Sequence, residues 1–342
     1  MMKAVSLKKV QLLVAGFVAG LMLLVGAGNL LAADIPNYKW TAALNVAEST
    51  INYKIVHKFK ELIEERSGGK IILNIYPNGQ LGSDKEMMEA LTMGNIGFSS
   101  TITTGLVDFV PENAVFDLPS AFPSLEVMRK VLDSPFKDLM NKYNAKGNIM
   151  LLGYADAGFR QTTSNRPIRS VADFDGLKIR VMQNPYHITY WKSLGANALA
   201  MDFSEVYIAL QQGQIDAQEN PYMNIVANKF YEAQKYVIET NHVGHIIVFV
   251  MNNHLYQSLP ANVKSLVDAC SKDAIAYGRS LADESIAADK KVITDNNVEI
   301  IKLSPADYEQ MKKKAAPVYK QIRAKIGDEL VDSFLKEIDA AK

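Results

Sequence analysis

The sequence predicts an α/β fold built on a parallel sheet, in a chain long enough for two domains. Short β-branched segments alternate with segments whose apolar residues recur at the spacing of a helix. Glycine and proline turn signals separate these segments, so strand and helix follow one another along most of the chain. The 342 residues, 48% of them hydrophobic, can bury more than one core.

The segments up to residue 102 alternate regularly between strand and helix. Strands are expected over residues 38–47, 70–76 and 96–102, and helices over residues 53–67 and 85–93. Gly68 and Gly94 end the two helices, and Pro77-Asn78-Gly79 forms a turn. This order predicts parallel strands that are joined by helical crossovers.

The rest of the chain continues the alternation and ends in an unusually long helix. Helices are expected over residues 125–143, 185–194 and 203–212, and strands over residues 149–155, 177–181, 215–218 and 243–250. Ser170 and Asp173 have capping-box spacing, which predicts a short helix. Residues 260–296 keep helical periodicity without an internal proline. At 1.5 Å per residue such a helix spans roughly 50 Å, so we expect it to cross two domains.

The first 33 residues have the pattern of a secretory signal. Lys3, Lys8 and Lys9 precede an apolar run that ends in small residues, so we expect cleavage near Ala33 and export to the periplasm. The run is also long enough for a retained membrane anchor, which is the alternative. Without the three lysines the chain keeps 34 of its 37 basic residues against 37 acidic ones. This balance predicts no nucleic-acid partner.

Motifs for catalysis, nucleotides and metals are missing from the sequence. It contains no G-x-S-x-G or Walker motif, and the single Cys270 cannot form an intramolecular disulfide. His242 and His245 are the best-spaced histidines, but we expect a strand to project them to opposite faces. No metal, cofactor or catalytic residue is therefore expected, and binding is favoured over catalysis.

Four polar side chains fall at the ends of expected strands. They are Asn45, Arg160, Arg180 and Asn220. Ligands of α/β sheets bind outside the carboxyl ends of the strands, and the planar fork of arginine suits a carboxylate. Each arginine has the alternative of a surface position or a structural ion pair. The residues alone predict an exported α/β protein with an anion-binding cleft.

Three longer stretches resemble the DctP family of solute receptors, which serve tripartite ATP-independent periplasmic (TRAP) transporters. They are GGKIILNIYPNGQLGSDKEMMEAL at 68–91, FRQTTSNRPIRSVADFDGLKIRV at 159–181, and WKSLGANALAMDFSEVYIALQQGQIDAQENP at 191–221. The central motifs resemble the sialic-acid and sugar-acid receptors of this family most.

The resemblance implies a two-lobed fold like that of type II periplasmic binding proteins. The first lobe would contain residues 34–157 and 246–285, and the second 158–245 and 286–342, with a long helix at about 260–296 shared by both. Such receptors are expected to act as monomers. They capture an organic acid and pass it to the small and large subunits of an ion-gradient-driven permease, without catalysis.

The resemblance also implies roles for individual residues. Arg180, in GLKIRV, matches the arginine that pairs with the ligand carboxylate, and Arg160 matches a second arginine that supports it. Asn220, in QENP, matches an amide on the same carboxylate. Phe203 falls where an aromatic ring packs on the ligand, with packing at a helix start as its alternative. Two positions match first-lobe contacts to the far end of the ligand: Asn45 and Asp84.

Some features leave the ligand and the system open. Asp84 could instead be an ordinary first-turn acid of a helix. Sialic-acid receptors carry a glutamate near the position of Ile102, where this chain has only threonines, so the ligand could equally be a uronate, a keto-sugar acid or a C4-dicarboxylate. Two other functions stay open: a receptor for an ATP-driven importer or a sensor, and a secreted sugar-acid hydrolase or lyase.

Overall fold

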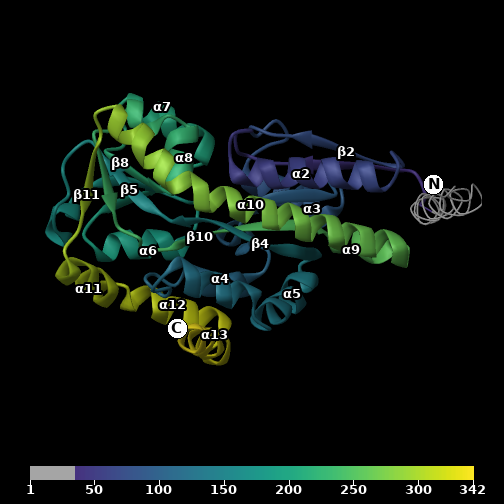
Figure 1. The fold of residues 1–342 in the computed structure, drawn as a ribbon. Helices are drawn as coiled ribbons and strands as arrows, with labels where there is room; N and C mark the ends of the chain where they lie inside the picture. Colours follow the sequence, from purple (N-terminus) through teal and green to yellow (C-terminus); the bar gives the residue numbers. More distant parts are fainter. Residues whose placement is uncertain (1–34) are drawn as a thin grey trace, which may run out of the picture.

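The computed structural model describes residues 35–342 as two β-sheets with helices packed around them (Figure 1). The first sheet has the order β2-β1-β3-β10-β4 and the second the order β11-β9-β5-β8-β6-β7. The first contains β1 (Tyr38–Ala43), β2 (Ile71–Tyr76), β3 (Phe98–Ile102), β4 (Ile149–Phe159) and β10 (Gly244–Asn252). The second contains β5 (Gln161–Ser164), β6 (Lys178–Val181), β7 (Asn197–Ala200), β8 (Ala217–Asn220), β9 (Tyr236–Glu239) and β11 (Glu299–Lys302).

The start of the first sheet has the predicted parallel order. β1 pairs in parallel with both β2 and β3, and the crossovers are α2 (Ile51–Arg66) and α3 (Asp84–Met93). Ser83 and Glu86 form a capping box at the start of α3. Gly94 ends this helix at φ 84°, a left-handed conformation that glycine adopts without steric cost.

Both sheets also contain antiparallel pairs, which the alternation of strands and helices along the chain did not predict. β10 runs antiparallel to β3 and β4, and β5 runs antiparallel to β8 and β9. The antiparallel pairs arise because the chain passes between the two sheets twice, once in each direction. β4 leads directly into β5 in the second sheet, and the chain returns after β9 to enter β10. Two strands that cross in opposite directions must pair antiparallel, as Gly244 does with Phe159.

The remaining helices cover the sheets, with two differences from prediction. They are α4 (Leu125–Asp133), α5 (Phe136–Lys146), α6 (Pro185–Ser193), α7 (Val206–Gln211), α8 (Tyr222–Ala227), α9 (Asn253–Ser258), α11 (Pro305–Lys314), α12 (Ala316–Ile326) and α13 (Asp328–Ala341). The single helix expected over 125–143 is two, because Pro135 has no N–H and keeps the preceding residue out of the helical region. The helix expected from Phe203 begins instead with a 3₁₀ turn before α7.

Helix α10 (Ala261–Asp295) is the predicted long helix, with 35 residues. It packs on α2 and β4 beside the first sheet, and on α8 and β11 beside the second. Figure 1 shows it in green, crossing both halves of the molecule. Because each sheet has its own helices, we propose that the lobes follow the predicted division, with α10 shared between them.

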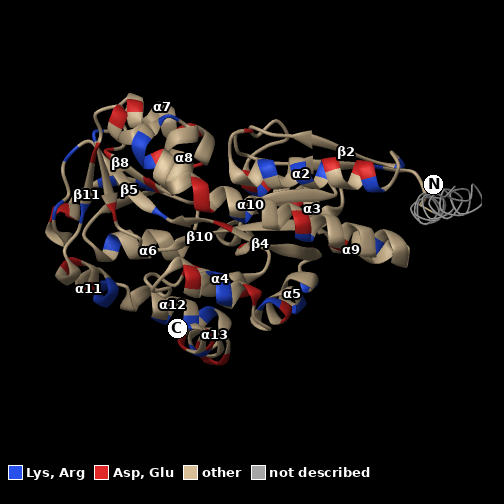
Figure 2. Cartoon of the chain, in the orientation of Figure 1, with Lys and Arg blue, Asp and Glu red and all other residues tan. Residues whose placement is uncertain are grey.

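The described chain has a mixed surface. Basic and acidic residues are interspersed over helices of both halves (Figure 2), as expected for a chain with equal numbers of each. Between residues 35 and 342, no helix is both long and apolar enough to cross a membrane. The expected secretory signal lies outside the described residues.

Gly278→Ala is expected to lower the free energy of unfolding by up to about 2 kcal/mol. An added Cβ would lie 2.4 Å from Cγ1 of the buried Ile55 on α2, so the packing of α10 must shift. Such overpacking costs about 1–3 kcal/mol, which outweighs the gain in helix propensity of up to about 1 kcal/mol. Denaturant unfolding measures the change. Lys272→Ala, at an exposed position of α10, is the control, and a stabilised Gly278→Ala would contradict the prediction.

Candidate ligand-binding site

A cleft with two adjoining hollows lies between the first and the second sheet. Their empty volumes are about 650 Å³ and about 470 Å³, including space that is open to solvent. Both halves of the chain line the cleft. The residues common to both hollows are Asp84, Thr101, Ile102, Arg180, Met182 and Phe203. A concave site with a few convergent polar groups is the usual form of a small-molecule site.

Arg180 presents a buried and incompletely paired cation to this cleft. Its side chain, on β6, is 3% exposed, and its Nε and Nη2 donate to the backbone oxygen of Met201 at 3.0 and 2.7 Å. Nη1 has no partner among the described residues. A guanidinium has five N–H donors and two are used, so three remain. Burial lowers the pKa of Arg180 to about 10, which keeps it charged at neutral pH.

Phe203 packs beside this guanidinium. Its ring centroid lies 5.8 Å from Cζ of Arg180, within the range of a cation–π contact, and its other neighbour is the buried ring of Phe230. Phe203 is only partly buried and lines both hollows. The ring therefore supports Arg180 and also offers an apolar surface to the cleft.

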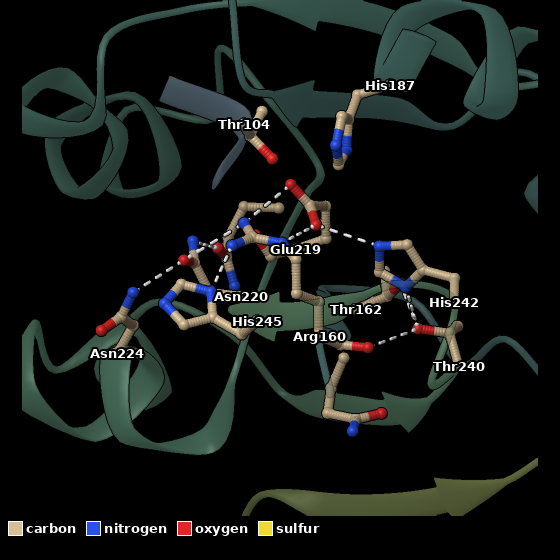
Figure 3. A network of polar contacts seen from close by, with 12 residues as sticks. Thr104, Arg160, Thr162, His187, Glu219, Asn220, Asn224, Thr240, His242 and His245 are labelled. Carbon is tan, nitrogen blue, oxygen red and sulfur yellow. Dashed lines mark hydrogen bonds and ion pairs between the residues drawn. The ribbon is translucent and has the colours of Figure 1, made fainter. Parts of the chain in front are cut away.

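Arg160 lies between β4 and β5 and is paired with Glu219 on β8 (Figure 3). Nε donates to one carboxylate oxygen, and Nη2 donates to the other at 2.9 Å and to the Glu219 backbone oxygen at 2.6 Å. Both side chains are buried. Burial alone would raise the pKa of Glu219, but Arg160 and His242 outweigh it and hold that pKa well below its usual range. The charge of Arg160 is therefore neutralised inside the protein.

His242 and His245 contact the ion pair of Arg160 and Glu219 from two sides, as Figure 3 shows. Nη1 of Arg160 donates to Nδ1 of His245 at 2.8 Å, and since arginine only donates, the His245 proton lies on Nε2. Burial and then Arg160 lower the pKa of His245. Nε2 of His242 lies 3.0 Å from the Glu219 carboxylate. The expectation that the pair points to opposite faces is wrong, because His242 precedes β10.

Asn220, at the end of β8, lies beside Arg160 and lines the second hollow with it. Its Oδ1 accepts from Arg160 Nη2 at 3.3 Å and from Asn224 Nδ2 at 3.0 Å. Its Nδ2 donates to Gln218 at 2.6 Å, which leaves one N–H free. Arg160 likewise keeps one hydrogen of Nη1, since His245 is the only partner of that nitrogen among residues 35–342. Three predicted residues therefore meet on one wall: Arg160, Arg180 and Asn220.

Asp84 faces them from the first residue of α3. Its Oδ2 accepts from Asn45 Nδ2 at 3.3 Å. Burial raises the pKa of Asp84, while the hydrogen bond from Asn45 and the charge of Arg180 act against this rise. Asp84 lines both hollows, whereas Asn45 lines neither. Five of the six predicted site residues thus border the cleft, and Asn45 lies behind Asp84 and donates a hydrogen bond to it.

The sequence analysis does not identify Glu219 behind the cleft or two polar side chains that line it. Glu219 stands next to Asn220, yet nothing in its local pattern indicates a buried acid. Ser100 and Asn224 line the second hollow, and each keeps a buried polar atom with no partner among the described residues. Within residues 35–342, the histidine, cysteine and acidic side chains form no group of three that could hold a metal ion.

The family model for bacterial extracellular solute-binding proteins, family 7 (DctP), matches residues 42–326. The chain belongs to this family. The C4-dicarboxylate-binding periplasmic protein DctP of Shewanella loihica is 32% identical to it over 290 residues, which cover 84% of this chain and 86% of that protein.

Solved structures of the DctP family have the same fold. The sugar acid binding protein DctPAm of Advenella mimigardefordensis, in complex with galactonate, has a TM-score of 0.87 and 31% identity. That match covers 90% of this chain and 100% of the other. A TRAP periplasmic solute-binding protein from Shewanella oneidensis with bound succinate has a TM-score of 0.84 and 28% identity, over 89% of this chain and 100% of that one. This DctP-family chain is a solute-binding receptor and not an enzyme.

Proposed function

We propose that this DctP-family receptor captures a small organic acid in the cleft and delivers it to the membrane subunits of a TRAP permease. The observation that carries the proposal is Arg180. Its guanidinium is buried and charged, yet Nη1 has no partner among residues 35–342. A buried polar atom without a partner is costly, and a ligand carboxylate would satisfy it.

The ligand carboxylate takes the free donors of the second lobe. Nη1 of Arg180 and the remaining hydrogen of its Nη2 hold the two carboxylate oxygens side by side. The free hydrogens of Arg160 and Asn220 reach the same anion, and Phe203 packs against the ligand body. When the lobes enclose the ligand, the loss of water strengthens these charge interactions.

The place of action follows from the family. Its members are extracellular binding proteins, so the receptor works outside the cytoplasm. We place it in the periplasm after cleavage near Ala33, as a monomer that carries ligand to the small and large permease subunits. Membership of the DctP family supports this system over an ATP-driven importer.

A thermal-shift panel tests the function directly. Galactonate, galacturonate, N-acetylneuraminate and succinate are each added to the protein, with the uncharged sugar galactose as the control. We expect at least one acid to raise the melting temperature, because a ligand at 100 times its Kd adds about 2.7 kcal/mol of stability. Galactose lacks the carboxylate and should cause no shift. A shift with galactose and with none of the acids would contradict the proposal.

A further inference from the structure

The two walls of the cleft differ in charge. Arg180 is available to a ligand, whereas Glu219 already neutralises Arg160 through two charge-assisted hydrogen bonds. The first lobe contributes Asp84, whose carboxylate borders both hollows. The buried part of the cleft therefore offers one position for an anion, and an acidic group shares the space in front of it.

Polar atoms beside these charges suit alcohol groups. Ser100 Oγ and Asn224 Oδ1 are buried without a partner in the described chain, and both side chains line the second hollow. A hydroxyl can donate to one of these atoms and accept from another, whereas a carboxylate can only accept. An ionised Asp84 also only accepts. Its partner in a filled cleft must therefore be a donor.

From this arrangement we infer that the ligand is a monocarboxylic acid with several hydroxyl groups, of the aldonate or uronate kind, and that Asp84 selects it. The inference rests on the proposed function. The carboxylate of the ligand pairs with Arg180, and its hydroxyls donate to Asp84 and exchange hydrogen bonds with Ser100 and Asn224. Asn45 orients Asp84 through the 3.3 Å hydrogen bond to Oδ2.

A C4-dicarboxylate fits these charges poorly. Its second carboxylate would meet Asp84, and two like charges repel strongly where water is excluded. Lys85 also lines the first hollow, but it is exposed, so solvent screens its charge. Overall similarity does not choose between the classes, because one similar structure holds galactonate and another holds succinate. The choice between a polyhydroxy acid and a dicarboxylate therefore rests on the side chains of this cleft.

Titration calorimetry on the unmodified protein ranks the two ligand classes. The probes are galactonate, gluconate and galacturonate against succinate, fumarate and malate. We expect at least one polyhydroxy acid to have a Kd at least tenfold below that of every dicarboxylate. A dicarboxylate that binds as tightly as the best polyhydroxy acid overturns the inference and leaves the proposed function intact. Failure of all these acids to bind would contradict the proposed function, and the inference with it.

Asp84→Asn removes the charge and keeps the size of the side chain. We expect the ratio of the succinate Kd to the Kd of the best polyhydroxy acid to fall at least tenfold. Asp138→Asn is the matched control, since Asp138 is an exposed first-turn acid of α5 and does not line the cleft. It should leave the ratio unchanged.

Two results would overturn the role of Asp84. One is an unaltered ratio in Asp84→Asn. The other is a loss of succinate affinity, without loss of polyhydroxy-acid affinity, in Lys85→Ala, because Lys85 would then recognise a second carboxylate. Melting curves without ligand establish that each variant is folded, and Asp84→Ser takes the place of Asp84→Asn if the latter does not fold.

Discussion

Arg180→Ala is expected to weaken binding of the acid by about 2–5 kcal/mol, which is a rise in Kd of about 30-fold or more. The variant removes the fork that holds the ligand carboxylate in a cleft from which water is excluded. The fold should persist, because within the described part of the chain the guanidinium contributes hydrogen bonds to Met201 and a ring contact with Phe203 and no ion pair. Titration calorimetry with the best acid of the panel measures the change.

Two further variants separate charge from geometry at this position. Arg180→Lys keeps the positive charge but loses the parallel donors, so its affinity should lie between those of wild type and Arg180→Ala. Arg166→Ala is the matched control: Nη2 of Arg166 donates to the backbone oxygens of Asp173 and Asp175, outside the cleft. It should bind normally. An unchanged Kd in Arg180→Ala would end the proposal that Arg180 holds the ligand.

Elements with strong local signals were predictable from the sequence. The helix expected over 53–67 is Ile51–Arg66, and the long helix expected over 260–296 is Ala261–Asp295. Both have helical periodicity and no internal proline, so periodicity alone places them within two residues. The sequence predicts one helix where the structure has α4 and α5, because the apolar spacing continues across Pro135. Proline is tolerated at a helix start, so it separates two helices there without interrupting the pattern.

The pairing of strands could not be read from local patterns. β5 pairs antiparallel with β8, with Gln161 opposite Asn220, and this pairing brings Arg160 and Glu219 together although they lie 59 positions apart in the sequence. The positions of Arg160 and Arg180 at strand ends predicted that both face one cleft. They did not predict that Glu219 forms an ion pair with Arg160. The division into a neutralised and an available arginine is thus a consequence of tertiary structure.

Glu219→Gln is expected to lower the free energy of unfolding by about 3–5 kcal/mol, the usual cost of leaving a buried charge without its partner. Glutamine has the same shape but no charge, so Arg160 keeps a positive charge in a buried position without its partner carboxylate. Denaturant unfolding at pH 7 measures the loss. Asp295→Ala, which removes the exposed pair with Lys291, is the control and should cost under about 1 kcal/mol.

The loss of unfolding free energy in Glu219→Gln should depend on pH, because the pKa of Glu219 is lowered in the folded protein. A carboxylate whose pKa is lower in the folded state contributes stability above its unfolded pKa, near 4.3, and loses it as the pH falls toward the folded value. The difference between wild type and Glu219→Gln should therefore stay constant from pH 8 to about 5 and narrow at more acidic pH. A difference that changes between pH 8 and 6 would indicate that His242 or His245, and not Glu219, is the titrating group.

A double variant distinguishes the loss of the partner from the loss of packing. Replacing both members, as in Arg160→Met with Glu219→Leu, removes the two buried charges together, and such replacements are often neutral or stabilising. We expect it to recover most of the stability that Glu219→Gln loses. Its affinity for the acid should still fall, because the free hydrogen of Arg160 and its bond to Asn220 are gone. If the double variant were no more stable than Glu219→Gln, the unpaired charge of Arg160 would not be the cause of the lost stability, and the loss would come from packing instead.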